Sequence, residues 1–99
     1  MFHKEIVKAR KYGYKYIIFG IKGCYYSETA KHVASKVPKT KYIQVNINSV
    51  DTNELKKIVG DPSLHVTWPQ IFKITPKRQK HISGGCTEFI NQKDVQAAI

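Results

Sequence analysis

Residues 16–27 read Tyr-Ile-Ile-Phe-Gly-Ile-Lys-Gly-Cys-Tyr-Tyr-Ser, and this stretch decides the fold. Its first residues, 16–20, form an apolar, aromatic and β-branched run, which predicts a short buried strand. Cys24 follows this strand and precedes a segment with helical spacing. A thiol at the start of a helix meets unpaired backbone N–H groups and the positive end of the helix dipole, and both favour the reactive thiolate. We therefore expect a reactive cysteine between a strand and a helix.

Ser27 stands where a second thiol would complete a Cys-x-x-Cys motif, which favours chemistry carried out by one sulfur atom. Gly23 frees the turn into the helix, and Lys22 places a positive charge near the sulfur. We predict that the pKa of Cys24 lies well below the value of about 8.5 for a free cysteine, because of the helix N-terminus and Lys22.

Hydrophobic periodicity divides the rest of the chain into alternating helices and strands. Helical spacing predicts one helix from Phe2 to near Gly13, one from Ser27 to Val37, and a helical tail that is interrupted near Asn91. Alternating or continuous apolar runs predict strands at residues 16–20, 41–47, 70–75 and 80–83.

The segment around Asp51 carries the clearest helix signals in the chain. Asp51 can cap a helix, with Glu54 as its capping-box partner. Val50 and Leu55 occupy the two positions of a hydrophobic staple. We expect this helix to end at Gly60, since glycine readily adopts the left-handed conformation that terminates helices.

The predicted order of elements is α-β-α-β-α-β-β-α. Strands joined by helices should pair in parallel through right-handed crossovers, and the final hairpin adds antiparallel strands. Helices must then cover both faces of the sheet. The sequence predicts an α/β, three-layer fold with a four-stranded mixed sheet, in a single domain over residues 1–99.

Composition limits the classes of function. A chain of 99 residues with two cysteines can bury a modest core and is too poor in cysteine for a disulfide scaffold. We find no secretory signal and no apolar run of the length that spans a bilayer. We therefore expect a cytoplasmic protein in a reducing environment, with no membrane partner.

The net charge of +10 gathers mainly in residues 4–15 and 73–80. Such clusters fit a solvated surface, electrostatic steering of anionic partners, or nucleic-acid binding. No recognition motif accompanies the charge, so we do not expect nucleic acid to be the main partner.

Three segments together resemble the glutaredoxin family of the thioredoxin fold. Residues 20–27 read Gly-Ile-Lys-Gly-Cys-Tyr-Tyr-Ser, residues 67–72 read Thr-Trp-Pro-Gln-Ile-Phe, and residues 84–88 read Gly-Gly-Cys-Thr-Glu. The resemblance covers about residues 16–89. It implies a thioredoxin-like fold, glutathione as cosubstrate, and reduction of glutathione mixed disulfides on proteins or small molecules. It also implies a protein that acts as a monomer.

The resemblance implies roles for residues around the thiol. Cys24 would be the nucleophile, and Tyr26 would pack beside the glutathionyl sulfur. The backbone of Trp68, directly before Pro69, would pair with the cysteinyl part of glutathione.

The remaining contacts to glutathione follow from the same resemblance. Thr87 and Glu88 would hold the γ-glutamyl end, and Lys22 would contact the glycyl carboxylate. The predicted third helix would supply another carboxylate contact, for which Lys56 and Lys57 remain alternatives. Separately, glycines 84 and 85 offer a turn whose backbone N–H groups could form an anion-binding nest.

The chain departs from the commonest glutaredoxin motif, Cys-Pro-Tyr-Cys, because Tyr25 and Ser27 replace the proline and the second cysteine. Without that thiol we expect a monothiol mechanism, in which glutathione supplies the second sulfur, and the hydroxyl of Ser27 can hydrogen-bond the thiolate. A second monothiol class, with Cys-Gly-Phe-Ser, carries iron–sulfur clusters together with glutathione. That function is the alternative, although Tyr25 and Tyr26 would crowd a bridging cluster.

Cys86 has two interpretations. It is either a bystander or the partner of Cys24 in a regulatory disulfide, and the sequence does not show whether the two are close enough. The four histidines are scattered without metal-ligand spacing, so we expect no metal and place them on the surface or on helix faces.

Overall fold

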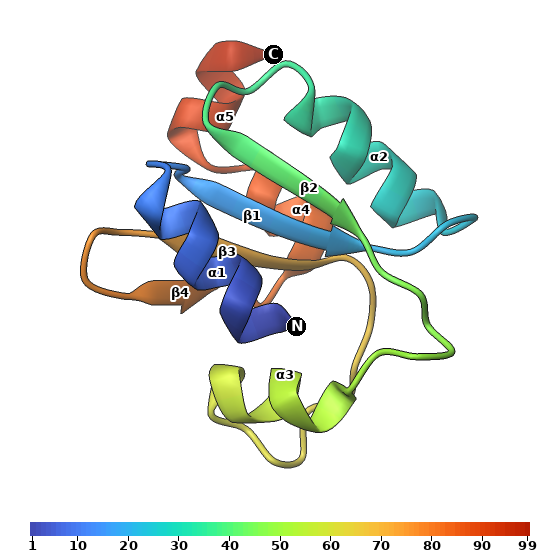
Figure 1. Ribbon diagram of the computed structural model, residues 1–99. Coiled ribbons are helices and arrows are strands. Elements are labelled where there is room, and N and C mark those ends of the chain that lie inside the picture. The colour runs from blue at the N-terminus through green and yellow to red at the C-terminus, as the bar shows by residue number, and fades with distance from the viewer.

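Four strands form one mixed sheet in the computed structural model, which describes residues 1–99 (Figure 1). Their order across the sheet is β2-β1-β3-β4, and their bounds are β1 Tyr16–Gly20, β2 Thr40–Gln44, β3 Gln70–Ile74 and β4 Gln79–His81. β1 pairs in parallel with β2 and antiparallel with β3, and β3 pairs antiparallel with β4. The predicted mixed sheet and its C-terminal hairpin are confirmed.

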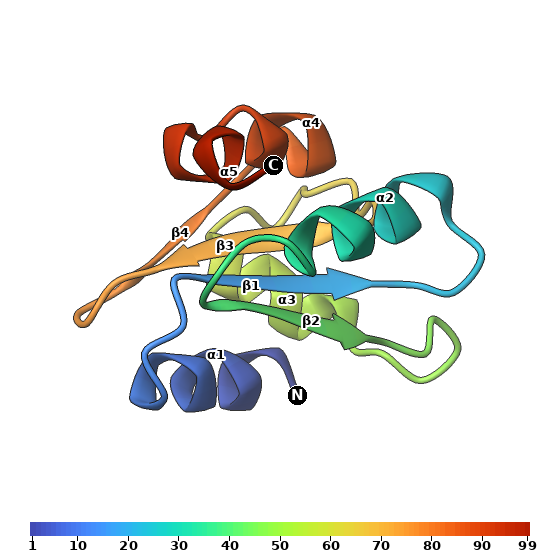
Figure 2. The ribbon, with the colours of Figure 1, turned by 90° about the horizontal axis from the view of Figure 1, so that it is seen from above.

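Helices cover both faces of the sheet, which confirms the three-layer, thioredoxin-like α/β fold (Figure 2). The bounds of the helices are α1 Phe2–Lys11, α2 Tyr25–Ala34, α3 Thr52–Val59, α4 Gly85–Ile90 and α5 Lys93–Ala98. The tail is interrupted where expected, since Asn91 ends α4. No helix here is both long enough and apolar enough to traverse a lipid bilayer.

Each face of the sheet has its own hydrophobic core. Ile17 and Phe19 pack with α1 and α3, whereas Tyr16 and Ile18 pack with α2, α4 and α5. All five residues of β1 are buried, as a central strand with two covered faces requires. This strand fixes the point at which the chain leaves the sheet after Gly20.

Two predicted boundaries are wrong by three residues. α2 ends at Ala34 and not at Val37, because the amides of Lys36 and Val37 bond carbonyl groups three residues back, in tighter turns. β2 ends at Gln44 and not at Ile47, which is 57% exposed. The cause is the length of the neighbouring strand: β1 stops at Gly20, so β2 has no partner beyond it.

The capping box predicted for α3 is also wrong in one half. Asp51 caps the helix and accepts a hydrogen bond from the Asn53 amide at 2.9 Å, as expected. Glu54, however, accepts hydrogen bonds from the N-terminal ammonium at 2.9 Å and from the backbone amides of Phe2 and His3. Glu54 therefore caps α1 and joins the first helix to the third.

The staple and the end of α3 follow the prediction. Leu55 is fully buried, and Val50 packs against the same core. Gly60 adopts the left-handed conformation, with φ of 81°, and its amide bonds the Lys56 carbonyl.

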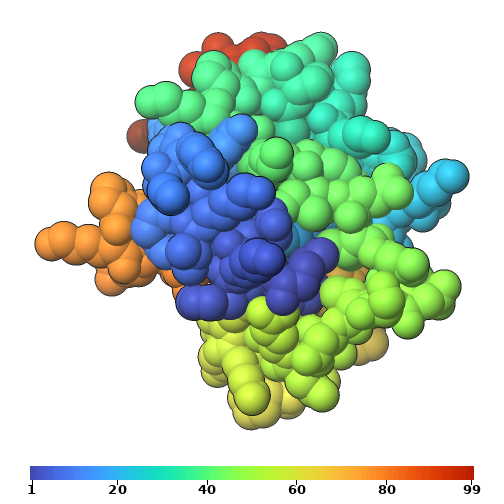
Figure 3. Space-filling view, viewed as in Figure 1, coloured from blue at the N-terminus to red at the C-terminus, as the bar shows by residue number.

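The two ends of the central strand face opposite poles of the molecule. Figure 3 shows the segment after β1 in light blue and the β3–β4 hairpin in orange, projecting from opposite sides. The hairpin pole also holds the start of β1, where Lys15 pairs with Asp94 at 3.1 Å. The pole after Gly20 holds the thiol.

Candidate active site

Cys24 lies between the buried strand β1 and the first turn of α2. Gly23 has a φ of 78°, a left-handed conformation that a glycine adopts at no steric cost, and it turns the chain from the strand into the helix. Cys24 is the N-cap residue of α2 and is half-buried. Its sulfur lies 3.7 Å from the carbonyl oxygen of Trp68, in the loop that precedes β3. The predicted position of the thiol at a helix start is confirmed.

The pKa of the Cys24 thiol is lowered, although burial opposes its ionisation. The Ser27 hydroxyl, together with the backbone N–H groups of Ser27 and Tyr26, stabilises the thiolate and outweighs that penalty. The charge of Glu28 acts in the opposite direction. The side chain of Cys24 closes no cap hydrogen bond, so these amides act on the sulfur as neighbouring dipoles.

The predicted effect of Lys22 is not found, because Lys22 is not among the groups that shift the pKa of Cys24. Its side chain is exposed and lines a separate hollow beyond the end of β2, together with Gln44 and Ile47. A charge on an exposed side chain is screened by water. The shift therefore comes from the helix start and Ser27.

Ser27 is a fully buried polar residue. Its hydroxyl oxygen accepts a hydrogen bond from the Ile21 amide at 3.2 Å and also acts on the Cys24 sulfur. Ser27 thus ties the loop after β1 to the first turn of α2. The serine holds the loop that carries the thiol, as well as leaving the motif without a second sulfur.

A groove of about 320 Å³, within the size range of small-molecule sites, is lined by Trp68, whose carbonyl oxygen the Cys24 sulfur approaches, although Cys24 itself is not part of the lining. It is bordered by the first turn of α2, by the loop before β3 and by the start of α4. The lining residues are Tyr26, Thr67, Trp68, Pro69, Gln70, His81, Ile82, Ser83, Gly84, Gly85, Cys86 and Thr87. The fold thus brings together four of the predicted glutathione contacts, Tyr26, Trp68, Pro69 and Thr87.

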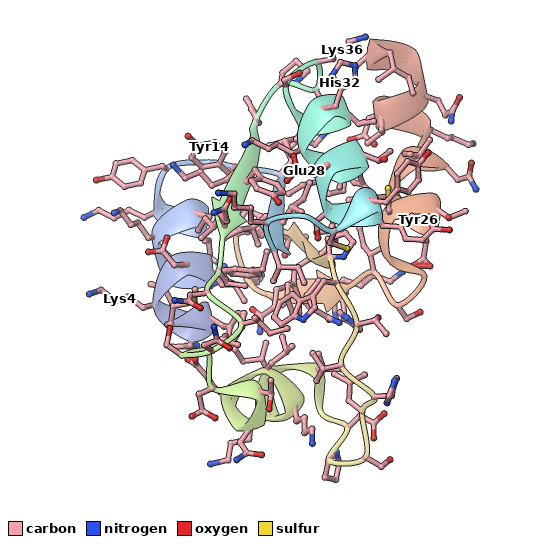
Figure 4. The ribbon with its side chains drawn as sticks, turned by 90° about the vertical axis from the view of Figure 1, so that its right-hand side faces the viewer. Lys4, Tyr14, Tyr26, Glu28, His32 and Lys36 are labelled. Carbon is pink, nitrogen blue, oxygen red and sulfur yellow. The ribbon has the colours of Figure 1, made fainter.

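Figure 4 shows Tyr26 and Glu28 on opposite sides of α2, with Tyr26 directed toward α4 and Glu28 toward β2. Tyr26 is 57% exposed and packs edge to face on Tyr25, with ring centroids 5.3 Å apart. The two rings form an aromatic rim beside Cys24.

The loop before β3 presents unused backbone groups to the groove. The Trp68–Pro69 peptide bond is cis, and the Trp68 amide forms no backbone hydrogen bond within the chain. The Trp68 ring stacks on Phe2, with centroids 6.4 Å apart. The side chain is anchored away from the groove while its backbone remains available.

The start of α4 differs from the predicted anion nest. The Gly84 amide bonds a carboxylate oxygen of Glu88 at 3.4 Å, and the Gly85 amide bonds the Ile82 carbonyl at 3.1 Å. Thr87 lines the groove, whereas Glu88 is not part of the lining and accepts the hydrogen bond from Gly84. Two of the expected nest amides are therefore already partnered.

Gln70 and His81 were missed as groove residues, and His81 is not the surface histidine that we predicted. Gln70 is buried, donates to the Thr67 carbonyl at 2.6 Å, and pairs through its oxygen with the His81 ring at 2.9 Å. The pKa of His81 is lowered by burial, although Glu88 acts against that change. A polar residue at a buried strand position was the available signal, and its pairing across the hairpin holds the loop before β3 in place.

Cys86 is buried in the core beneath the groove, and neither cysteine is in a disulfide. Burial raises the pKa of the Cys86 thiol, and the charge of Cys24 raises it further. A thiol that resists ionisation is a poor nucleophile, so the two cysteines have opposite chemical character. The chain has no group of three or more His, Cys, Asp or Glu side chains that could together hold a metal ion.

Two curated proteins are similar to this chain. Both are named Glutaredoxin 1, one from Salmonella typhimurium (strain LT2) and one from Salmonella typhi, and each is 40% identical to the chain over 79 residues. The similarity covers 74% of this chain and 83% of each relative. No protein-family model and no solved structure matches the chain.

Proposed function

The chain belongs to the glutaredoxin family, and we propose that it reduces glutathione mixed disulfides through a single thiol, Cys24. Family membership makes it a glutathione-dependent disulfide oxidoreductase. The substrates that we propose are glutathionylated or disulfide-containing proteins and small mixed disulfides. We further propose that residues 1–99 act as one domain, because both cores share the same sheet.

The first step is attack by the Cys24 thiolate on the glutathione sulfur of a mixed disulfide. A new bond forms between Cys24 and that sulfur, the original disulfide bond breaks, and the substrate leaves as a thiolate that takes up a proton. The lowered pKa of Cys24 supports this role, because the thiolate is the attacking form.

The second step uses a free glutathione molecule. Its thiolate attacks the glutathione sulfur bound to Cys24, glutathione disulfide leaves, and the Cys24 thiolate is restored. The net change is oxidation of the one free glutathione, which joins the glutathionyl group of the mixed disulfide as glutathione disulfide, and reduction of the substrate sulfur to a thiol.

The groove supports a binding mode for the glutathionyl group. We propose that the free Trp68 amide and its carbonyl pair with the cysteinyl backbone, while Tyr26 packs beside the sulfur. Thr87 would contact the γ-glutamyl end, and Glu88 would act there by holding the turn. We also propose Lys22 for the glycyl carboxylate, which requires its exposed side chain to turn from the hollow beyond β2 toward the groove.

The observation that carries the single-thiol mechanism is Ser27. It fills the second motif position with a buried hydroxyl that is hydrogen-bonded to Ile21, so the motif has no second sulfur to form an internal disulfide. The cosubstrate must then supply the resolving thiol.

Turnover with glutathione and a small glutathione mixed disulfide tests the mechanism. Cys24→Ser is expected to lose all turnover, and Ser27→Cys is expected to gain activity toward disulfides within proteins. Ser27→Ala is the matched control, because it removes the hydroxyl without adding a thiol. Turnover that survives in Cys24→Ser would contradict the proposal.

The iron–sulfur alternative has a distinct signature. It predicts a brown, glutathione-dependent dimer after purification without air, whereas our proposal predicts a colourless protein with full turnover. The aromatic rim of Tyr25 and Tyr26 supports the second outcome, because it occupies space that a bridging cluster would need.

A further inference from the structure

The hydroxyl of Tyr42 is a buried polar group without a hydrogen-bond partner. Tyr42 lies on β2, opposite Ile18 of β1, and its side chain reaches along the sheet to Gly20. A Cβ atom at position 20 would collide with the Tyr42 hydroxyl and would lie 2.7 Å from the adjacent ring carbon. Gly20 therefore leaves the space that the phenol fills, at the end of β1 where the active-site loop begins.

The surroundings of this hydroxyl belong to the active site. Burial raises the pKa of Tyr42, the charges of Glu28 and Cys24 raise it further, and the Ser27 hydroxyl acts in the opposite direction. On the ring face, the Lys31 ammonium lies 5.7 Å from the ring centroid. The Tyr42 hydroxyl therefore lies where Glu28, Cys24 and Ser27 all act on it, yet it has no hydrogen-bond partner.

Ser27 has one unused acceptor position. A serine hydroxyl can donate once and accept twice. One lone pair of the Ser27 oxygen accepts a hydrogen bond from the Ile21 amide nitrogen at 3.2 Å, and the hydroxyl also acts on the Cys24 sulfur. The second lone pair has no donor among the hydrogen bonds of the chain. The Tyr42 hydroxyl lies over Gly20, and the Ser27 hydroxyl is bonded to the amide of the next residue, Ile21, so an unpaired donor and an unfilled acceptor meet at the end of β1.

We propose that Tyr42 is a positioning residue, whose hydroxyl donates to Ser27 and so directs the Ser27 proton at the Cys24 thiolate. The inference deepens the proposed function and rests on it, because it assigns a support to the thiolate that performs the attack. Hydrogen bonds in series strengthen one another, so the contact closes when ionised Cys24 draws the Ser27 proton. The Tyr42 hydroxyl is available for this contact, because it has no other hydrogen-bond partner.

A purely structural role would look different. Phenylalanine keeps the aromatic ring of Tyr42 in place and lacks only the hydroxyl that lies over Gly20, so Tyr42→Phe preserves most of the packing. If Tyr42 serves only to fill the core, this change leaves the thiol untouched. If Tyr42 acts through Ser27, the change weakens the support of the thiolate.

The test measures the pH dependence of iodoacetamide alkylation at Cys24, resolved from Cys86 by peptide mass spectrometry. Tyr42→Phe is expected to raise the apparent pKa of Cys24, so that the thiolate fraction below that pKa falls about fivefold, the size expected for one hydrogen bond of about 1 kcal/mol. In a Ser27→Ala background, the same change at Tyr42 is expected to have no further effect.

Tyr16→Phe is the matched control. Tyr16 belongs to the same core, and its hydroxyl bonds Asp94 at 2.7 Å, at the other end of β1. Its removal is expected to leave the alkylation profile of Cys24 unchanged. Circular dichroism at the assay temperature establishes that each variant is folded.

Two results would overturn the proposal: an unchanged Cys24 profile in folded Tyr42→Phe, or an equal shift with and without Ser27. Should Tyr42→Phe not fold, 3-fluorotyrosine at position 42 provides a stronger donor, and the Cys24 pKa must then fall. Because alkylation uses no glutathione, failure here leaves Cys24 turnover standing, whereas turnover in Cys24→Ser would remove the proposed function itself.

Discussion

Tyr16 and Tyr42 pack into the same core above opposite ends of β1, but their hydroxyl groups differ in their partners. The Tyr16 hydroxyl bonds Asp94, which also pairs with Lys15. The Tyr42 hydroxyl lies over Gly20 and bonds nothing. A satisfied buried hydroxyl stabilises the fold, whereas an unsatisfied one costs stability and is more often found where function requires it. We call the end of the core at Tyr16 and Asp94 the structural pole, and the end at Gly20, Ser27 and Tyr42 the chemical pole.

Gly20→Ala is the change that should break this comparison most strongly. The added methyl group would overlap the Tyr42 phenol, and relief requires the ring to leave its place beside Ser27. Overpacking of this kind costs about 3 kcal/mol, which urea denaturation would measure as a lower free energy of unfolding. Alkylation of Cys24 should weaken in the same variant, and recovery is expected in Gly20→Ala combined with Tyr42→Phe, which has a smaller side chain. Full stability of Gly20→Ala would show that the contact is easily relieved.

Tyr16→Phe tests the structural pole and should cost about 2 kcal/mol of unfolding free energy, because a buried hydrogen bond to a carboxylate is lost. Unlike Gly20→Ala, it should leave turnover at Cys24 unchanged. A drop in turnover with intact folding would mean that the two poles are coupled.

The local sequence was sufficient to predict the strand, the turn and the helix that hold Cys24. The apolar run of β1, the left-handed Gly23 and the helical spacing after Cys24 are neighbours in the chain, so their short-range preferences agree with the fold. The same is true of the Asp51 cap and the Gly60 terminus.

Features that depend on distant segments could not be predicted in this way. Glu54 fitted a capping box, but the N-terminus of α1, which is remote in sequence, offers it an ammonium group and amides. Ile47 continued an alternating pattern, yet the strand ended with its neighbour. Gln70 and His81 meet only because the hairpin pairs their strands. Sequence spacing reports each residue's preference, whereas the fold decides which partner is available.

Asp94 gives the structural pole a defined dependence on pH. Burial opposes ionisation of Asp94, but hydrogen bonds from Tyr16 and Lys15 outweigh it and lower the pKa. A carboxyl whose folded pKa is depressed contributes stability above its unfolded pKa of about 3.9, and that stability is lost as the pH falls through the folded value. We expect Asp94→Asn to flatten this part of the acid-unfolding curve. The effect should be smaller than that of Tyr16→Phe, because the carboxylate is 36% exposed and water screens its charge. An acid-unfolding curve identical to that of the parent protein would exclude Asp94 as its source.

Glu28→Gln should have the smallest effect, and at the chemical pole it should be an improvement. The Glu28 charge raises the pKa of both Cys24 and Tyr42, so its removal stabilises the thiolate. Because Glu28 is exposed, the gain should be about twofold in the alkylation rate below the pKa of Cys24, and it should vanish at high salt. Lys31→Gln on the same helix is the control of opposite charge, since Lys31 lies over the Tyr42 ring. The Cys24 thiolate would then be stabilised by Ser27 and by the amides at the start of α2, with Tyr42 acting through Ser27. A change in Glu28→Gln that does not depend on salt would instead mean that Glu28 holds the hydroxyl groups of Tyr42 and Ser27 in position. The reactivity of Cys24 would then depend on a surface residue as well as on the buried ones.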